Sequence, residues 1–221
     1  MASERWATFD CYGTLVDWDA GIFATLARIF GQRNAPRLLG RYHELEPALE
    51  HDGSRKYRDV LNEALWGIAG EEGVTLNQDE TTALADSLPD WPPFPEVSAA
   101  LAELCRRDWR LAILSNSDRD LIAASQERLG VPFELAVVAG EIHSYKPAHA
   151  HWERFFEQTG ADRGRHVHVA ASLFHDIAPA RELGLTSVWI NRRGEEPRPT
   201  PTRELNDLQP LPETLDELVP A

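Results

Sequence analysis

The hydrophobic and polar positions divide the chain into parts with different periodicity. A short β-prone apolar run comes first, at residues 5–10. Over residues 19–90 the apolar positions recur every three to four residues, which is the spacing of a buried helix face, and strand signals are absent. A proline-rich turn at 89–95 precedes a second half in which short apolar runs alternate with helical segments. The pattern predicts a helical block inside a chain of alternating strands and helices.

The second half of the chain predicts its elements one by one. The expected strands are 111–114, 135–139, 167–170 and 187–190, and the expected helices are 96–106, 120–129, 147–158 and 176–183. Pro147 suits the first turn of its helix, and Gly130 and Gly184 are expected to end two others. Strands that alternate with helices form right-handed βαβ units and therefore a parallel sheet.

The run at residues 5–10 must join this sheet, because one strand cannot form a sheet alone. We therefore predict an α/β fold with a Rossmann-like parallel-sheet core made of residues 1–18 and 92–221. Residues 19–91 would form a helical domain inserted between the first and second core strands. The Pro-rich, polar tail is expected to hold one more short element at 211–219.

Composition narrows the class of partner. Of the 221 residues 43% are hydrophobic, which is enough for a sizeable core, and the formal net charge is −14. This charge argues against nucleic acid and anionic membranes as partners, although a small basic pocket can still bind an anionic substrate. Cys11 and Cys105 lie far apart, without an apolar signal segment or an 18-residue apolar run, so we expect free thiols in a reducing cytoplasm.

Polar side chains follow four of the predicted strands. They are Asp10 and Thr14 after the first, Ser115 and Asn116 after the second, Lys146 after the third, and Ser172, His175 and Asp176 after the fourth. The carboxyl ends of parallel strands meet at one edge of a sheet, so these side chains can converge on a small volume. Two carboxylates, an ammonium, hydroxyls and an amide there suit a negatively charged substrate.

Each of these residues also has an ordinary structural explanation. Asp10 is a nucleophile, a metal ligand or a helix cap, and Ser115 and Asn116 suit the cap of the next helix. Lys146 alone is typical of a surface lysine, and Asp176 suits the positive end of a helix. Their joint occurrence at successive strand ends favours a site.

The four motifs, in this order, resemble those of the haloacid dehalogenase-like (HAD) hydrolase superfamily. They are Asp10–Leu15, Ser115-Asn116, Lys146-Pro147 and Ser172 with Asp176, and the helical insertion resembles the superfamily's cap. Within it, the form Asp10-Cys11-Tyr12-Gly13-Thr14, the run Leu114-Ser115-Asn116 and the stretch 188–192 are similar to the type II (S)-2-haloacid dehalogenases. The resemblance implies a homodimer.

Position 12 separates two branches of that superfamily. Its phosphatases carry an aspartate there that protonates the leaving alkoxide, whereas this chain has Tyr12, with no comparable proton to give at neutral pH. A halide leaves without an acid. The phosphatases also place a metal-binding aspartate where this chain has Ala171. The resemblance therefore implies a site without metal or cofactor, in which Lys146 supplies the positive charge.

The implied reaction is a two-step displacement on a small 2-haloalkanoic acid. Asp10 attacks the α-carbon, halide leaves, and water then hydrolyses the Asp10 ester to a 2-hydroxy acid of inverted configuration. Lys146 would keep Asp10 ionised, and Asp176 would orient Lys146 and the water. The substrate contacts are expected from Tyr12, Thr14, Ser115, Asn116 and Ser172.

The sequence differs from the dehalogenase pattern at two places. One concerns the residue that positions the hydrolytic water, and the other concerns the residue that binds the leaving halide. Leu173 stands where the dehalogenases carry an asparagine that positions water, and the neighbouring His175 is the candidate base. The family's halide-binding arginine is expected at Arg41, with Tyr42 and His43 as alternatives in that helix.

Three other functions remain open at this point. The same nucleophile would serve a hydrolase of another activated C–N or C–O bond. A small-molecule phosphatase is disfavoured by Tyr12 and Ala171. A catalytically weak binding protein is disfavoured because Asp10, Thr14 and Lys146 are all present.

Overall fold

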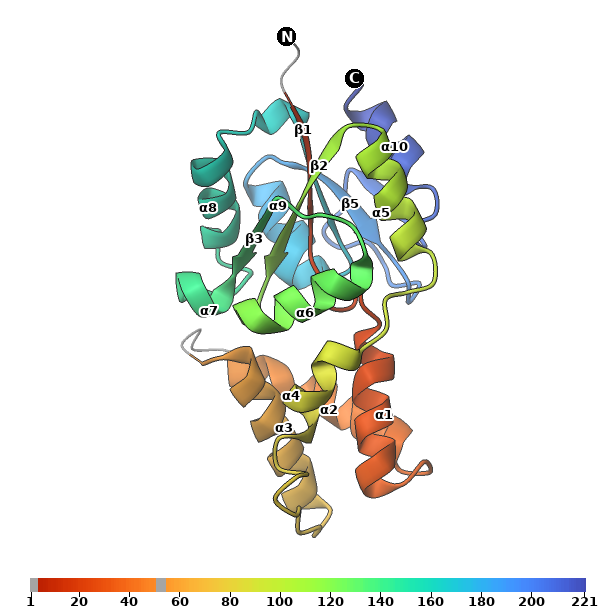
Figure 1. Ribbon diagram of the computed structural model, residues 1–221, viewed down its shortest axis with the longest axis vertical. Coiled ribbons are helices and arrows are strands. Elements are labelled where there is room, and N and C mark those ends of the chain that lie inside the picture. The colour runs from red at the N-terminus through yellow and green to blue at the C-terminus, as the bar shows by residue number, and fades with distance from the viewer. Residues whose placement is uncertain (1–3, 51–54) are drawn as a thin grey trace.

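A parallel sheet with helices on both faces forms the larger part of the protein. The computed structural model describes residues 4–50 and 55–221 (Figure 1). Within this part the strands pair in the order β3-β2-β1-β4-β5-β6, and all pairs are parallel. They are β1 (Arg5–Phe9), β2 (Trp109–Ser115), β3 (Leu135–Val138), β4 (His166–Ala170), β5 (Thr186–Ile190) and β6 (Arg203–Leu205). The predicted α/β fold is confirmed.

The two faces of the sheet bury different sets of side chains. Their helices are α5 (Val97–Arg106), α6 (Arg119–Leu129), α7 (Ala139–Ile142), α8 (Ala150–Thr159), α9 (Ala178–Glu182) and α10 (Leu211–Leu218). Side chains alternate along a strand, so Ala7 and Phe9 join the core with α5 and α10, while Trp6 packs with Phe155 of α8. Because both faces are covered, the strands are apolar runs, as the sequence pattern required.

A block of helices lies beyond the carboxyl edge of the sheet, at the bottom of Figure 1. This helix block consists of α1 (Trp18–Phe30), α2 (Ala35–Glu50), α3 (Tyr57–Glu71) and α4 (Ala83–Ser87), followed by a 3₁₀ turn at Leu88–Asp90. Helix α2 packs between α1 and α3, with Leu38 and Leu65 fully buried. A Cβ added at Gly21 would lie 2.3 Å from the ring of Trp91, so glycine lets the returning linker pack on α1.

The chain crosses between the helix block and the sheet next to β1. It leaves the sheet after β1 and returns before α5, as the inserted position predicts. Strand β1 is central, with β2 on one side and β4 on the other, so the chain order reverses there. Ligand crevices of open α/β sheets lie at such a reversal, outside the carboxyl ends of the strands.

Two local predictions were wrong, and one strand was not predicted. Helix α8 begins at Ala150 rather than at Pro147, because 145–148 forms a turn in which the Ala148 N–H donates to the Tyr145 carbonyl. The helix expected from Asp176 begins earlier, as a π-helical turn over Leu173–Ile177, where the Ser172 hydroxyl accepts the His175 N–H. Strand β6 was missed because its side chains are polar and mostly exposed, and only pairing with β5 defines it.

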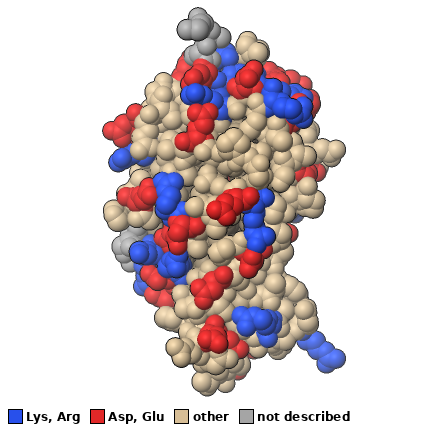
Figure 2. Space-filling model, viewed as in Figure 1, with Lys and Arg blue, Asp and Glu red and all other residues tan. Residues whose placement is uncertain are grey.

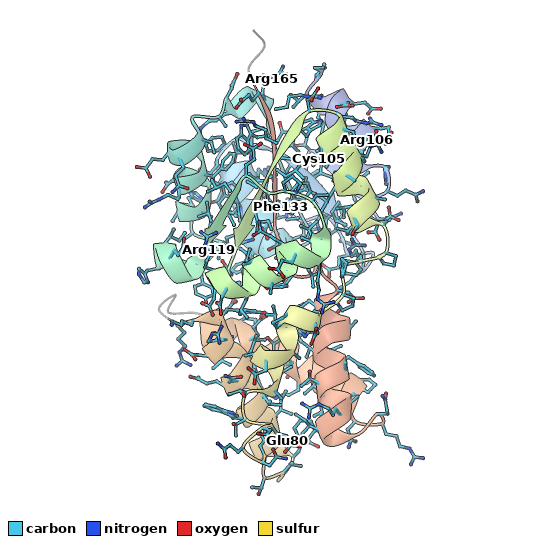
Figure 3. The ribbon with its side chains drawn as sticks, in the orientation of Figure 1. Glu80, Cys105, Arg106, Arg119, Phe133 and Arg165 are labelled. Atoms are coloured by element: carbon cyan, nitrogen blue, oxygen red, sulfur yellow. The ribbon has the colours of Figure 1, made fainter. Side chains whose placement is uncertain are left out.

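The surface carries both signs of charge. Figure 2 shows acidic and basic side chains interspersed on the visible face of the sheet layer and the helix block. Cys105 lies on α5 and Glu80 at the far end of the helix block (Figure 3), and both cysteines are free thiols. Within 4–50 and 55–221, the helices fall short of the length and apolar character needed to cross a membrane.

Candidate active site

A cavity of about 620 Å³ lies between the carboxyl edge of the sheet and the helix block. The sheet edge contributes Asp10, Tyr12, Ser115, Asn116, Lys146, Ser172, His175 and Asp176, and the helix block contributes Trp18, Asp19, His43, Glu46, Glu50 and Tyr57. Most residues that the sequence predicted for the site are therefore brought together. Thr14 and Arg41 do not line the cavity.

Lys146 joins the two carboxylates of the sheet edge. Its Nζ donates to Asp10 Oδ1 at 2.9 Å, to Asp176 Oδ1 at 2.6 Å and to the Leu114 carbonyl at 2.9 Å, so all three protons are used. Burial alone would lower the pKa of Lys146, but the charges of Asp10 and Asp176 raise it overall. Burial alone would raise the pKa of Asp176, and Lys146 and His168 lower it overall. At neutral pH the ammonium is therefore charged and fixed beside Asp10.

Thr14 holds Asp10 rather than facing the cavity. Its hydroxyl donates to Asp10 Oδ2 at 2.7 Å and accepts the Ala171 N–H at 2.9 Å, and the residue is fully buried. The predicted substrate contact from Thr14 is therefore wrong, because its only hydroxyl proton is donated to Asp10 and the residue does not line the cavity. Gly13, at φ +85°, turns the chain between the two residues. Each oxygen of Asp10 thus accepts one hydrogen bond, and the side chain remains partly exposed to the cavity.

Asn116 fixes the loop that carries Lys146. Its Nδ2 donates to the Lys146 carbonyl at 3.0 Å, and its Oδ1 accepts the Lys146 N–H at 2.6 Å. The neighbouring Ser115 lines the cavity, and its carbonyl lies 3.0 Å from Nε2 of His151. Of the two residues that follow β2, Asn116 therefore positions Lys146. Ser115 lines the cavity, where it is available to a ligand.

A buried polar chain behind Asp176 was missed at the sequence level. His168 Nε2 lies 3.0 Å from Asp176 Oδ1, and its Nδ1 lies 2.8 Å from the Thr8 hydroxyl. That hydroxyl also lies 2.8 Å from Nε2 of His166. Two histidines at alternate positions of a buried strand share one face of the sheet, and this pattern could have identified them. The chain fixes Asp176 from the side away from the cavity.

His175 is a neutral imidazole at the cavity wall. Burial is the main cause that lowers its pKa, with a smaller opposing effect from Asp176. Its Nδ1 lies 3.2 Å from the Ser172 hydroxyl, and its Nε2 lies 3.8 Å from Glu50 Oε2. A neutral, cavity-lining imidazole of this kind is able to accept a proton near neutral pH.

Arg41 points away from the cavity. Its guanidinium donates to Glu71 at 2.8 and 2.6 Å and to Glu44 at 2.7 Å, on the exposed side of the helix block. The halide contact predicted for Arg41 is therefore wrong. The reason is helical periodicity: positions 43, 46 and 50 of α2 share the face toward the cavity. Of the three candidates in this helix, His43 lines the cavity.

Glu46 and Glu50 are cavity residues that the sequence interpretation missed. Burial raises the pKa of Glu46 to about 7, although a hydrogen bond from the Tyr57 hydroxyl at 3.1 Å lowers it. Burial and the charge of Glu46 raise the pKa of Glu50 to about 9, against the lowering effect of Lys146. Acidic residues one helical turn apart on a face otherwise buried were the signal available in the sequence.

Tyr12 forms an aromatic wall. Its ring stacks on Tyr57 with centroids 5.9 Å apart, and its hydroxyl lies 3.2 Å from that of Ser125. Burial is the main cause that raises the pKa of Tyr12 well above its usual value. The position therefore offers shape and hydrophobic contact rather than a labile proton at neutral pH.

Protein donors engage three of the four carboxylate oxygens of Asp10 and Asp176. Oδ1 of Asp10 and Oδ1 of Asp176 both accept from the Lys146 ammonium, and Oδ2 of Asp10 accepts from Thr14. One buried oxygen, Asp176 Oδ2, is left without a hydrogen bond among the described residues. Over the described ranges, no group of three or more His, Cys, Asp or Glu side chains is arranged to hold a metal. Mg²⁺ takes about six oxygen ligands, several of which are usually waters, so two carboxylates that already bind an ammonium supply few protein ligands for it.

The fold and the site define an α/β protein of hydrolase type, with a polar cavity where the order of the parallel strands reverses. The family model for the haloacid dehalogenase-like hydrolases matches residues 5–184. The chain belongs to this family.

Named relatives and one solved structure extend this result. The (S)-2-haloacid dehalogenase of Pseudomonas sp. (strain YL) is 29% identical, over 94% of this chain and 93% of its own length. A phosphoserine phosphatase of Thermus thermophilus is 30% identical, over 70% of this chain and 61% of its own. The crystal structure of an L-2-haloacid dehalogenase superposes with a TM-score of 0.84 at 22% identity, covering 97% of this chain and all of the other. At that identity the structural likeness concerns the fold alone.

Proposed function

We propose that this protein hydrolyses the carbon–halogen bond of short 2-haloalkanoic acids and releases 2-hydroxy acids. The observation that carries the proposal is Asp10, held by Lys146 and Thr14 at a cavity edge where Tyr12 replaces the acid that a phosphatase needs. The near full-length similarity to an (S)-2-haloacid dehalogenase supports the same reaction.

The first step is displacement at the α-carbon. The substrate carboxylate is held near the sheet edge by Ser115, Ser172 and adjacent backbone N–H groups, with the Lys146 charge close by. A carboxylate oxygen of Asp10 attacks the carbon from behind the halogen, and halide leaves with the bonding electrons. The hydrogen bonds from Lys146 and Thr14 fix the Asp10 side chain, which reduces the entropy lost on reaching the reactive geometry.

The second step is hydrolysis of the Asp10 ester. His175 removes a proton from a water that attacks the ester carbonyl, and Asp176 keeps Lys146 in place beside the developing oxyanion. Cleavage returns the Asp10 carboxylate and releases the 2-hydroxy acid. Attack on the carboxyl carbon of Asp10 leaves the substrate carbon untouched, so the configuration inverted in the first step is retained.

The helix block serves as a cap over this chemistry. We divide the chain into a core of residues 1–18 and 92–221 and a cap of 19–91, of which 1–3 and 51–54 lie outside the described part. A cap that closes over a small substrate excludes water from the first step. A homodimer and a cytoplasmic location complete the proposal, the latter supported by the free thiols Cys11 and Cys105.

Halide release tests the proposal. Bromoacetate and (S)-2-chloropropionate are incubated with wild-type protein in EDTA, beside Asp10→Asn and the exposed control Asp79→Asn. We expect release from the wild type and the control and none from Asp10→Asn. Phosphate release from phosphoserine that requires Mg²⁺, without halide release, would establish the phosphatase alternative instead. That alternative draws on the Thermus relative and is opposed by Tyr12.

A further inference from the structure

The end of β5 and the residues after it hold Thr14 at two points. The Trp189 indole N–H donates to the Ala171 carbonyl at 2.9 Å, and the Ala171 N–H donates to the Thr14 hydroxyl at 2.9 Å. Nη2 of Arg192 donates to the Thr14 carbonyl at 3.0 Å. The Thr14 hydroxyl in turn donates to Asp10 Oδ2 at 2.7 Å. The side chain and the main chain of Thr14 are therefore both fixed from β5, and Thr14 fixes Asp10.

The same guanidinium contacts the chain where it returns from the helix block. We call residues 14–17 the outgoing linker and residues 92–96 the returning linker. Nη2 of Arg192 also donates to Glu96 Oε1 at 2.7 Å, and Cζ of Arg192 lies 3.6 Å from the centroid of the Phe94 ring. Burial alone would raise the pKa of Glu96, and hydrogen bonds from its own backbone and from Arg192 lower it overall. The pair is therefore charged at neutral pH.

The two linkers are hydrogen-bonded to each other. The Phe94 N–H donates to the Leu15 carbonyl at 3.1 Å, and the Asp17 N–H donates to the Pro92 carbonyl at 2.8 Å. Arg192 contacts the outgoing linker at its first residue and the returning linker at two side chains, so one side chain joins both linkers where they meet the sheet layer. The position of the helix block and the position of the Asp10 turn therefore depend on the same guanidinium.

We propose that Arg192 is a positioning residue: it ties both linkers to the Thr14 carbonyl and thereby holds Asp10 in the geometry for attack on the α-carbon. The inference rests on the proposed dehalogenase function. Displacement requires the attacking oxygen at about 3–3.5 Å from the carbon and in line with the breaking bond, and a misplacement of about 1 Å can cost about 10²-fold in rate. Arg192 acts on this geometry through Thr14.

The contacts of Arg192 need a guanidinium rather than any cation. Both protons of Nη2 are used, one by the Thr14 carbonyl and one by Glu96, while the planar group covers the Phe94 ring. A lysine side chain ends one bond earlier than Nη2, and its ammonium has no planar face for an aromatic ring. A lysine at this position would therefore keep the charge but lose part of the contact set.

Single-turnover bromide release from bromoacetate separates positioning from substrate binding, because bromide leaves when the Asp10 ester forms. We compare wild type, Arg192→Met, Arg192→Lys and the control Arg198→Met, an arginine that is 86% exposed. We expect the maximum rate to fall about 100-fold in Arg192→Met and about 10-fold in Arg192→Lys. The half-saturating concentration should stay within about 3-fold of wild type, since a positioning residue contributes to the transition state and not to ground-state binding. Arg198→Met should match wild type.

Hydrogen exchange provides a second test, which does not depend on turnover. The amide protons of Phe94 and Asp17 are bonded between the linkers. In Arg192→Met their exchange, measured by NMR, should be faster by about 10-fold or more, while the amides of β3 should exchange as in wild type. Wild-type exchange in both linkers would overturn the proposal.

The kinetic outcomes are equally decisive. Arg192 lines the cavity, so a raised half-saturating concentration at an unchanged maximum rate would make it a substrate-binding residue and overturn the proposal. If Arg192→Met does not fold, Arg192→Lys decides, and a wild-type maximum rate in that variant overturns the proposal. Absence of bromide release from the wild-type protein defeats the proposed function instead, and the exchange experiment then still decides whether Arg192 joins the linkers.

Discussion

The two walls of the cavity are built on opposite electrostatic principles. On the sheet edge, the Lys146 ammonium pairs with Asp10 and Asp176, and nearly every polar atom there has a partner within hydrogen-bond distance. On the helix wall, burial is the largest cause that shifts Glu46 and Glu50 toward the neutral form. One cavity thus has carboxylates paired with an ammonium on one side and carboxyls shifted toward the protonated form on the other.

Removal of Lys146 is the strongest test of the sheet wall. Lys146→Met leaves Asp10 and Asp176 buried without their cation, and breaking a buried pair in this way costs about 3–5 kcal/mol. We expect the free energy of unfolding in urea to fall by that amount and halide release to be lost. Lys56→Met, at an exposed position, is the control. An unchanged unfolding free energy would refute the charged description of this wall.

The buried chain of His168, Thr8 and His166 provides a second test of the sheet wall. His168→Leu removes the group next to Asp176, and a hydrogen bond to a charged group contributes about 1.5–3 kcal/mol. We expect urea unfolding to show a loss in that range and kcat to decrease. The half-exposed His149, which pairs with exposed Glu182, provides the control His149→Leu. Equal stability of the two variants would mean that the chain does not support Asp176.

The raised pKa of Glu50 on the helix wall predicts that the folded protein becomes less stable as the pH rises. Between the ordinary glutamate pKa and about 9, the folded protein holds a proton on Glu50 that the unfolded chain has released, so stability falls as pH rises. From pH 7 to 8 we expect Glu50 to contribute a decrease of about 1.4 kcal/mol that is lost in Glu50→Gln, which leaves only the smaller slope from Glu46, whose pKa is raised to about 7. Chemical denaturation at each pH measures it. An undiminished slope in Glu50→Gln would show that another group is responsible.

The smallest expected effect is that of replacing Arg41, which lies on the side of α2 that faces away from the cavity. Arg41→Ala removes exposed ion pairs, which contribute about 0–1 kcal/mol, and it should leave kcat/KM for bromoacetate within about 2-fold of wild type. His43→Ala, on the cavity side, should raise KM. If instead Arg41→Ala abolished turnover and His43→Ala did not, α2 would have to present its other face to the cavity in the working enzyme.

The sequence by itself determined the α/β fold and the residues of the sheet edge. Short continuous apolar runs and a period near 3.6 distinguish buried strands from helices locally, and parallel strands must bring their carboxyl ends together. Asp10, Lys146 and Asp176 could therefore be assigned to one site without coordinates. Strand β6 could not, because its polar residues carry no periodic signal and only the neighbouring strand pairs with them.

Tertiary structure alone decided which atoms face the cavity. Thr14 and Arg41 carry suitable chemistry, yet one is engaged by Asp10 and Ala171 and the other by Glu71 and Glu44. The protonation of Glu50 likewise depends on the water excluded by packed neighbours and on a second carboxyl one helical turn away. Burial and orientation are properties of the assembled fold, so no local pattern in the chain contains them.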